Sequence, residues 1–262
     1  PTDLVGKRVL VTGSSRGIGA QVAQFCADAG ASVVINYRNK EARAEKIAQA
    51  IRDAGGVAHT AGADLTDPVA VMAMMNTVRD ELGGLDVLVL NASGGMEADV
   101  EQDYAMKLNR DAQVGMLTSA LPLMGAGARV VFITSHQAHF IRDVDTMPEY
   151  RPVALSKRAG EDALRAMADD LDGKGIGFVV VSGDMIEGTV TATLLNRMHP
   201  GALEARKEVA GTIYNVEEFA AEVTKAIVDD IPDDHSRLVG DTSSFQPRER
   251  CFWACDPTLG SF

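Results

Sequence analysis

Short runs of aliphatic and β-branched residues alternate along the chain with longer stretches whose hydrophobic residues recur at helical spacing. Continuous apolar runs of this kind are typical of strands buried on both faces of a parallel sheet. The stretches between them, such as 41–54, 69–82 and 156–171, are rich in Ala, Met, Glu and Arg, which favour helices. The pattern predicts an α/β, doubly wound fold with a parallel sheet of about seven strands. The strands are expected near 8–11, 32–36, 57–60, 87–90, 130–134, 178–181 and 238–239.

The domain organisation follows from the same alternation, which continues without a linker-like segment to about residue 240. This indicates a single domain over residues 1–240. Residues 184–212 have helical spacing interrupted at Pro200-Gly201, so we expect them to form a lid over a substrate pocket. Residues 241–262 lose the pattern and are interpreted as a C-terminal tail.

The composition narrows the choice of partners. The chain carries 25 Lys and Arg residues against 37 Asp and Glu residues, a formal charge of −12, which disfavours nucleic acid and anionic membrane surfaces. No apolar run reaches the roughly 20 residues that span a bilayer, and the first residues lack the layout of a signal peptide, so we expect a cytoplasmic protein. The cysteines Cys26, Cys251 and Cys255 form neither a disulfide framework nor a paired metal motif, and no metal site is expected.

A glycine-rich turn follows the first predicted strand. Residues 12–19 read TGSSRGIG and lead directly into a helical run. Glycines at such a turn allow the backbone to approach a pyrophosphate closely, and the next helix presents unpaired N–H groups and the positive end of its dipole. The order of strand, turn and helix predicts a dinucleotide ligand.

This turn resembles the TGxxxGxG turn of the short-chain dehydrogenase/reductase family, whose members have a single-domain Rossmann-like fold. The resemblance covers about residues 5–240 and implies an oxidoreductase that acts on a small-molecule ketone or secondary alcohol. It also implies a homo-oligomer, a tetramer or a dimer, with interfaces along 101–124 and the helix around Lys157. Further matches occur in the family's order: Asp64 in GADLTD, Asn91-Ala92-Ser93-Gly94 in place of NNAG, Asn109, Ser135 at the end of VVFITS, and Lys157 in ALSKRAG.

The end of the second strand indicates which cofactor is used. It reads Asn36-Tyr37-Arg38-Asn39, without the carboxylate that holds the adenosine ribose in NAD-preferring proteins. Arg38 and Arg16 can instead pair with the extra phosphate of NADP, so NADP(H) is the predicted cofactor. The resemblance extends the cofactor contacts to a larger set: Gly13, Ser15, Arg16, Gly17, Ile18, Gly19, Tyr37, Arg38, Asn39, Asp64, Leu65, Asn91, Ala92, Ser93, Lys157 and Thr189.

The catalytic residues that the resemblance implies are incomplete. Ser135 matches the residue that polarises the carbonyl, Lys157 the residue that assists the proton donor, and Asn109 the residue of a water-linked relay. The family's proton donor is a tyrosine four residues before the lysine, but that position is Val153, which cannot donate a proton. The nearest tyrosine is Tyr150, seven residues before Lys157.

Three explanations for the missing tyrosine remain open. In the first, Tyr150 donates the proton from a loop, because Pro152 suits the first turn of a helix and disfavours a helical Arg151. In the second, the donor is another residue near the pocket, and the candidates are His136, His139, Asp184 and Glu187. In the third, proton transfer is lost or left to water, and the protein is a slow enzyme, or a sensor or scaffold that binds the cofactor. We favour an NADP(H)-dependent oxidoreductase with an atypical proton donor.

Overall fold

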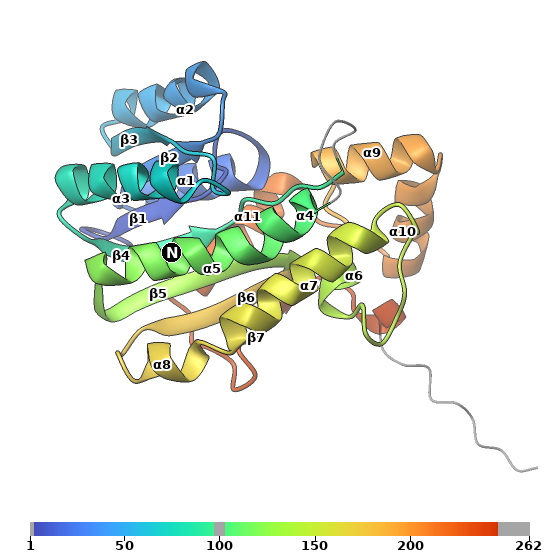
Figure 1. The fold of residues 1–262 in the computed structure, drawn as a ribbon. Coiled ribbons are helices and arrows are strands. Elements are labelled where there is room, and N and C mark those ends of the chain that lie inside the picture. Colours follow the sequence, from blue (N-terminus) through green and yellow to red (C-terminus); the bar gives the residue numbers. More distant parts are fainter. Residues whose placement is uncertain (1–2, 97–102, 246–262) are drawn as a thin grey trace, which may run out of the picture.

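The sheet of the computed structural model, which describes residues 3–96 and 103–245, lies at the centre of the fold (Figure 1). Its seven strands are all parallel and follow the order β3-β2-β1-β4-β5-β6-β7. The predicted α/β fold with about seven strands is confirmed. The strands are β1 Arg8–Val11, β2 Ser32–Tyr37, β3 Val57–Gly62, β4 Leu85–Leu90, β5 Met124–Ser135, β6 Gly177–Gly183 and β7 Ser236–Val239.

Helices cover both faces of the sheet, because side chains along each strand alternate between two cores. On β1, Val9 and Val11 join one core, and Leu10 joins the other. The first core contains residues of α1 Gly17–Asp28, α2 Glu41–Asp53 and α11 Val216–Ala226. The second contains residues of α3 Pro68–Leu82, α5 Ala112–Ala120, α7 Arg151–Arg165 and α8 Ala168–Asp172.

The strand order reverses direction between β1 and β4, and this reversal positions the ligand site. The chain builds β1, β2 and β3 toward one edge, then crosses back to place β4 beside β1. The connections after β1 and β4 therefore leave the sheet in opposite directions and open a crevice at its carboxyl edge. The glycine-rich turn after β1 lies at this crevice.

The helical segments differ from the prediction in two places. The predicted helix 156–171 begins earlier, at Arg151, and is divided into α7 and α8. The run 101–124 is also divided, and its first two residues lie outside the described part of the chain. The described elements of that run are α4 Tyr104–Met106, the π-helical turn η1 Lys107–Asp111, α5, the 3-10 turn η2 Leu121–Leu123 and the first residue of β5.

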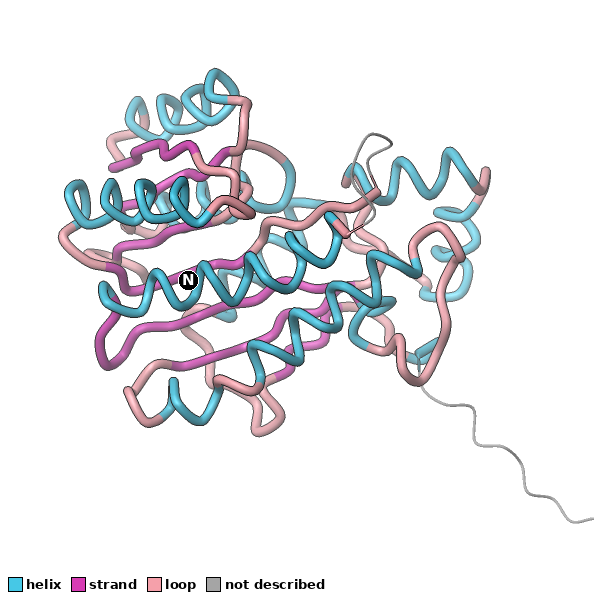
Figure 2. Tube along the Cα trace, in the orientation of Figure 1, coloured by secondary structure: helices cyan, strands magenta, loops and turns pink. Residues whose placement is uncertain are grey.

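The predicted lid segment contains two helices, α9 Val190–Met198 and α10 Ala202–Ala210. They are separated at Pro200-Gly201, as the sequence indicates, and Gly201 has a positive φ of 88°. Figure 2 shows the pair at one end of the sheet. Residues of α9 share a buried cluster with Ala138 of the short helix α6 His136–His139, which follows β5.

The C-terminal segment is described as far as residue 245. After β7, residues 243–245 form the 3-10 turn η3 Ser243–Phe245, whose Phe245 is buried. The remainder of the predicted tail, including Cys251, Cys255 and Trp253, lies outside the described residues. Cys26 is a buried free thiol, and burial raises its pKa to about 12. In the described ranges, no helix has the length and apolar character that crossing a membrane requires.

Candidate active site

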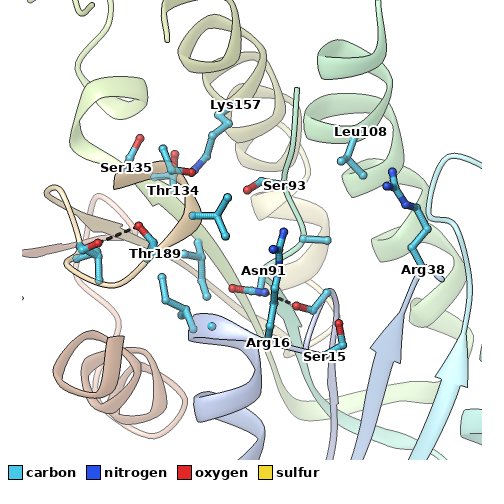
Figure 3. Close-up of a pocket in the computed structure, with 18 of the residues that line it drawn as sticks. Ser15, Arg16, Arg38, Asn91, Ser93, Leu108, Thr134, Ser135, Lys157 and Thr189 are labelled. Carbon is cyan, nitrogen blue, oxygen red and sulfur yellow. Dashed lines mark hydrogen bonds between the residues drawn. The ribbon is translucent and has the colours of Figure 1, made fainter. Parts of the chain in front are cut away.

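A cavity of about 710 Å³ opens at the carboxyl edge of the sheet (Figure 3). Its walls come from the glycine-rich turn, the ends of β2, β5 and β6, the loop after β4, α7 and the predicted lid segment. Two of the residues predicted for the site, Gly19 and Asn109, are not among the described residues that line it. The predicted residues that do line it are Gly13, Ser15, Arg16, Gly17, Ile18, Tyr37, Arg38, Asn39, Asp64, Leu65, Asn91, Ala92, Ser93, Ser135, Tyr150, Lys157 and Thr189.

The glycine-rich turn brings the backbone and the N-terminus of α1 to the cavity wall. Gly13 and Gly17 have φ values of 60° and 57°, which favour glycine. Gly19 serves close packing instead, because a Cβ there would lie 2.4 Å from the Asn91 side-chain nitrogen and 2.9 Å from the Gly13 carbonyl oxygen. The N-cap residue Arg16 makes no side-chain hydrogen bond to the first turn of α1, so the N–H groups of this turn can bind an anionic ligand.

Two asparagines brace this turn from opposite sides. The Gly13 N–H donates to Asn36 Oδ1 at 2.9 Å, and Asn91 Nδ2 donates to the carbonyls of Thr12 (3.0 Å) and Gly13 (3.1 Å). The buried Asn36 is not in the predicted set of site residues, because its place at the end of β2 is the only signal that the sequence offers for it. These bonds fix the position of the turn relative to the ends of β2 and β4.

The cavity is basic although the chain is acidic. Asp64 is one of its carboxylates, and it accepts bonds from the N–H and hydroxyl of Thr66 (2.9 and 2.7 Å). The lining contains five basic side chains against two carboxylates: Arg16, Arg38, Lys40, Arg43 and Lys157, with Asp64 and Asp184. This balance suits a ligand with several negative charges.

Three basic residues of this set lie together after β2. Lys40 and Arg43, at the start of α2, are not in the predicted set, although the basic run NYRNKEAR is the sequence signal for them. Arg38 donates a hydrogen bond to the hydroxyl of Tyr104, and its guanidinium lies 5.9 Å from the centre of that ring. Arg38 therefore connects the end of β2 to α4 at the cavity wall.

At the other end of the cavity, two hydroxyl groups meet. Ser135 is the last residue of β5, and its Oγ lies 3.0 Å from the Oη of Tyr150. Tyr150 is only 4% exposed, yet it lines the cavity, and Lys157 of α7 lines the same cavity. Figure 3 shows Ser135 and Lys157 close together, far from Arg38. Two convergent hydroxyls of this kind can both bond to one carbonyl oxygen.

As predicted, Tyr150 lies in a turn ahead of the helix, but the prediction that Arg151 is not helical is wrong. Tyr150 is the N-cap residue of α7 with helical torsion angles (φ −91°, ψ −20°), and Arg151 is the first helical residue. Pro152 lies within the first turn, where its missing N–H needs no partner, and the bias against a helical residue before proline is overridden. The N–H groups of Tyr150 and Arg151 both donate to the Met147 carbonyl at 2.9 Å, which adds a turn ahead of the helix.

Asn109 lies behind the cavity wall, in the π-helical turn η1. Its Nδ2 donates to the Gly94 carbonyl (2.8 Å) and to Ser156 Oγ (2.9 Å), and its Oδ1 accepts from the Gly94 N–H (3.2 Å). A Cβ at Gly160 would lie 1.9 Å from the Asn109 carbonyl oxygen, so η1 and α7 pack backbone to backbone. In this structure Asn109 ties the loop after β4 to α7.

Comparison with known proteins identifies the family. A sequence profile of short chain dehydrogenases matches residues 7–199. The chain belongs to the short chain dehydrogenase family. It is 29% identical over 263 residues to versicolorin reductase stcU of Emericella nidulans, with 98% of this chain and 94% of that protein covered.

Solved structures of short chain dehydrogenases share the fold. One from Burkholderia cenocepacia J2315 in complex with NADP superposes with a TM-score of 0.76 at 28% identity, covering 90% of this chain and 97% of that one. Angucycline C-6 ketoreductase LanV with bound NADP gives a TM-score of 0.73 at 25% identity, covering 90% and 95%.

The structure places the two histidines considered as alternative proton donors outside the described cavity lining. The His136 ring is fully buried, its Nδ1 lies 2.8 Å from Ser182 Oγ, and burial lowers its pKa to about 4. His139 Nδ1 lies 2.8 Å from Glu161 Oε1, which is also fully buried. In this short chain dehydrogenase each of the two rings contacts a buried side chain outside the described cavity lining.

The two acidic alternatives are paired with basic side chains. Glu187 accepts a bond from Lys207 (3.0 Å) and is not among the described lining residues. Asp184 does line the cavity, but its carboxylate accepts from the Met185 N–H and from Arg206 Nε, both at 2.7 Å. Burial raises the pKa of Asp184, and these two bonds oppose the rise.

Thr189, in the predicted lid segment, is the N-cap residue of α9. Its Oγ1 accepts from the Ala192 N–H (3.2 Å) and donates to the Ile186 carbonyl (2.8 Å). Thr189 therefore both caps the helix and faces the cavity. Within the described ranges, no group of three or more His, Cys, Asp or Glu residues is arranged to hold a metal ion.

Proposed function

We propose that this short chain dehydrogenase uses NADP(H) to reduce a ketone or to oxidise a secondary alcohol, with Tyr150 as the proton donor. The observation that carries the proposal is the 3.0 Å separation between Tyr150 Oη and Ser135 Oγ in a cavity that Lys157 also lines. Tyr150 thus places its hydroxyl beside Ser135 although it precedes the family position, now Val153, by three residues.

The residues of the cavity fit NADP(H). The glycine-rich turn and the N-terminus of α1 suit the pyrophosphate, and Arg38 and Arg16 suit the 2′-phosphate, with Lys40 and Arg43 nearby. The two NADP complexes among the related structures support this choice. When bound, NADPH supplies the hydride that adds to the carbonyl carbon.

The protein's own residues manage the charge on the substrate oxygen. As the carbonyl carbon is reduced, its oxygen becomes an alkoxide that needs hydrogen bonds and then a proton. In the proposed reaction Ser135 donates a hydrogen bond to that oxygen and Tyr150 transfers its phenolic proton to it. The positive charge of Lys157 stabilises the phenolate that remains, and solvent then returns the proton.

The lid side of the cavity suits an apolar substrate. Its lining includes Met185, Ile186, Val190 and Leu195, and the nearby carboxylate of Asp184 is paired with Arg206. An apolar surface of this kind favours a carbonyl compound with a sizeable hydrophobic part.

The test compares NADPH oxidation by wild type, Tyr150→Phe and Tyr214→Phe with a series of ketones. Tyr214 is the matched control, because it is a partly buried tyrosine that is not among the described lining residues. We expect Tyr150→Phe to lose about 100-fold or more in kcat with unchanged NADPH affinity, since a positioned general acid contributes about 10²- to 10⁴-fold. Tyr214→Phe should retain wild-type kcat.

Two results would count against the proposal. Equal kcat for Tyr150→Phe and wild type would exclude Tyr150 as the donor. Tight NADPH binding by wild type without turnover of any ketone or alcohol would favour the sensor or scaffold function instead.

A further inference from the structure

One arginine joins the lid helices, α9 and α10, to the carboxyl edge of the sheet. Arg206 of α10 donates from Nε to Asp184 Oδ2 (2.7 Å) and from Nη2 to Asp241 Oδ2 (3.1 Å). The side chains of Arg206, Asp184 and Asp241 are 13%, 3% and 25% exposed. Asp184 directly follows β6 and Asp241 follows β7, so both carboxylates belong to the ends of strands. Removing a cation that largely buried carboxylates share is costly in free energy, because the removal leaves the carboxylate charges unpaired.

The same guanidinium also contacts the described C-terminal segment. Arg206 Nη1 donates to Ser244 Oγ (2.8 Å), and its Cζ lies 5.2 Å from the centre of the Phe245 ring. Phe245 in turn stacks on Phe140 (5.7 Å between centroids) and meets the edge of His136 (5.3 Å). The lid, the C-terminal segment and the helix after β5 are therefore joined at one point.

The opposite side of the lid packs against the element that carries Tyr150. Leu195 of α9 belongs to the same buried cluster as Tyr150, and Leu203 of α10 packs against that cluster. His199 Nε2, between the two lid helices, lies 3.0 Å from the carboxylate of Glu149, the residue before Tyr150. The lid thus forms part of the surface that holds the tyrosine in place.

The position of Tyr150 makes this support important. Tyr150 is the N-cap residue of α7, whereas the family position at 153 is inside the helix. Helix ends open locally at much lower free energy than helix interiors. A phenol at the N-cap therefore depends more on tertiary packing for a fixed position than one inside the helix does.

We propose that Arg206 is a positioning residue for proton transfer, which holds the lid against the sheet and so keeps Tyr150 beside Ser135. The inference rests on the proposed function, since it assigns Arg206 an effect on the step that Tyr150 performs. Arg206 acts through the lid and the tyrosine, and it is not among the described residues that line the cavity.

The neighbouring Lys207 provides a matched control. It lies on the same helix and also pairs with a residue after β6, Glu187, at 3.0 Å. Its side chain is 31% exposed and that of Glu187 is 47% exposed. Exposed pairs of this kind contribute little to stability, so Lys207→Met should alter the lid far less than Arg206→Met.

The experiment measures amide hydrogen exchange, NADPH affinity and ketone reduction for wild type, Arg206→Met, Arg206→Lys and Lys207→Met. For Arg206→Met we expect exchange about tenfold faster in residues 190–210 and in the first turn of α7. NADPH affinity should stay within about twofold, and kcat should fall about 10- to 100-fold, as expected when a reacting group is misplaced. Arg206→Lys should recover part of kcat, and Lys207→Met should match wild type.

Asp241→Asn is a milder change that can be measured if Arg206→Met does not fold. It should also make amide exchange faster in the lid helices and lower kcat.

The outcomes separate this inference from the proposed function. Unchanged exchange in Arg206→Met would overturn the anchoring of the lid. Faster exchange in the lid with wild-type kcat, or without change in the first turn of α7, would overturn the link to Tyr150. If wild type reduces no ketone, the proposed function fails, and exchange in the lid and in α7 still decides whether Arg206 holds them.

Discussion

Replacing His136 by asparagine probes the one histidine whose pKa is strongly lowered. The His136 ring is fully buried between Ser182 and the ring of Phe245. Burial, and then the nearby charges of His139 and Arg206, lower its pKa from 6.5 to about 4. The folded protein therefore keeps this ring neutral at pH values where the unfolded chain protonates it. Asparagine cannot titrate in this range, but it can still bond to Ser182.

The size of the effect follows from proton linkage. Below pH 6.5 the unfolded chain binds a proton at His136 that the folded protein does not bind. The contribution of the neutral ring to the free energy of unfolding is therefore fully present above pH 6.5 and is lost as the pH falls toward about 4. Between pH 8 and pH 5, these two pKa values correspond to a loss of about 2 kcal/mol. In His136→Asn this contribution is absent. The free energy of unfolding of wild type minus that of His136→Asn should thus be about 2 kcal/mol smaller at pH 5 than at pH 8.

Urea denaturation at fixed protein concentration between pH 8 and pH 5 measures this difference. Ile51→Val, a change in a buried apolar residue of α2, is the control, because its cost of about 0.5–1.5 kcal/mol should not depend on pH. A stability difference for His136→Asn that stays constant with pH would refute the reasoning.

Two further predictions concern the packing of α7 and the choice of cofactor. Gly160→Ala should cost about 3 kcal/mol or more in urea denaturation, because its Cβ would lie 1.9 Å from the Asn109 carbonyl oxygen. Gly115→Ala in α5, where no neighbouring atom lies within 4 Å of the added Cβ, should instead stabilise by about 0.5–1 kcal/mol, and equal effects would contradict the packing argument. Arg38→Ala should weaken NADPH binding about 10- to 100-fold in fluorescence titration and NADH binding less than about twofold, whereas Arg52→Ala should affect neither. A similar loss for both cofactors would show that Arg38 does not recognise the extra phosphate.

The sequence by itself determined the strands, the glycine-rich turn and the family. Each of these depends on residues close together in the chain. The apolar run at 8–11 predicts a strand because continuous apolar runs are typical of strands buried on both faces of a parallel sheet. TGSSRGIG predicts a phosphate-binding turn because glycine readily adopts the positive φ angles that such a turn needs. The break at Pro200-Gly201 divides the lid for the same local reason. Local signals also led to one error, the non-helical conformation expected of Arg151, because a bias against a helical residue before proline is weaker than the packing around it.

Tertiary structure alone decided which side chains meet. Tyr150 lies beside Ser135 because the start of α7 is brought to the end of β5, which its spacing of seven residues from Lys157 does not specify. Arg206 reaches Asp184 and Asp241 only because three separate segments end at the same edge of the sheet. Periodicity specifies which face of an element is buried, but not which distant element covers that face. The convergence of groups from several elements depends on the packing of the whole domain, and that is where the proposed chemistry of this chain lies.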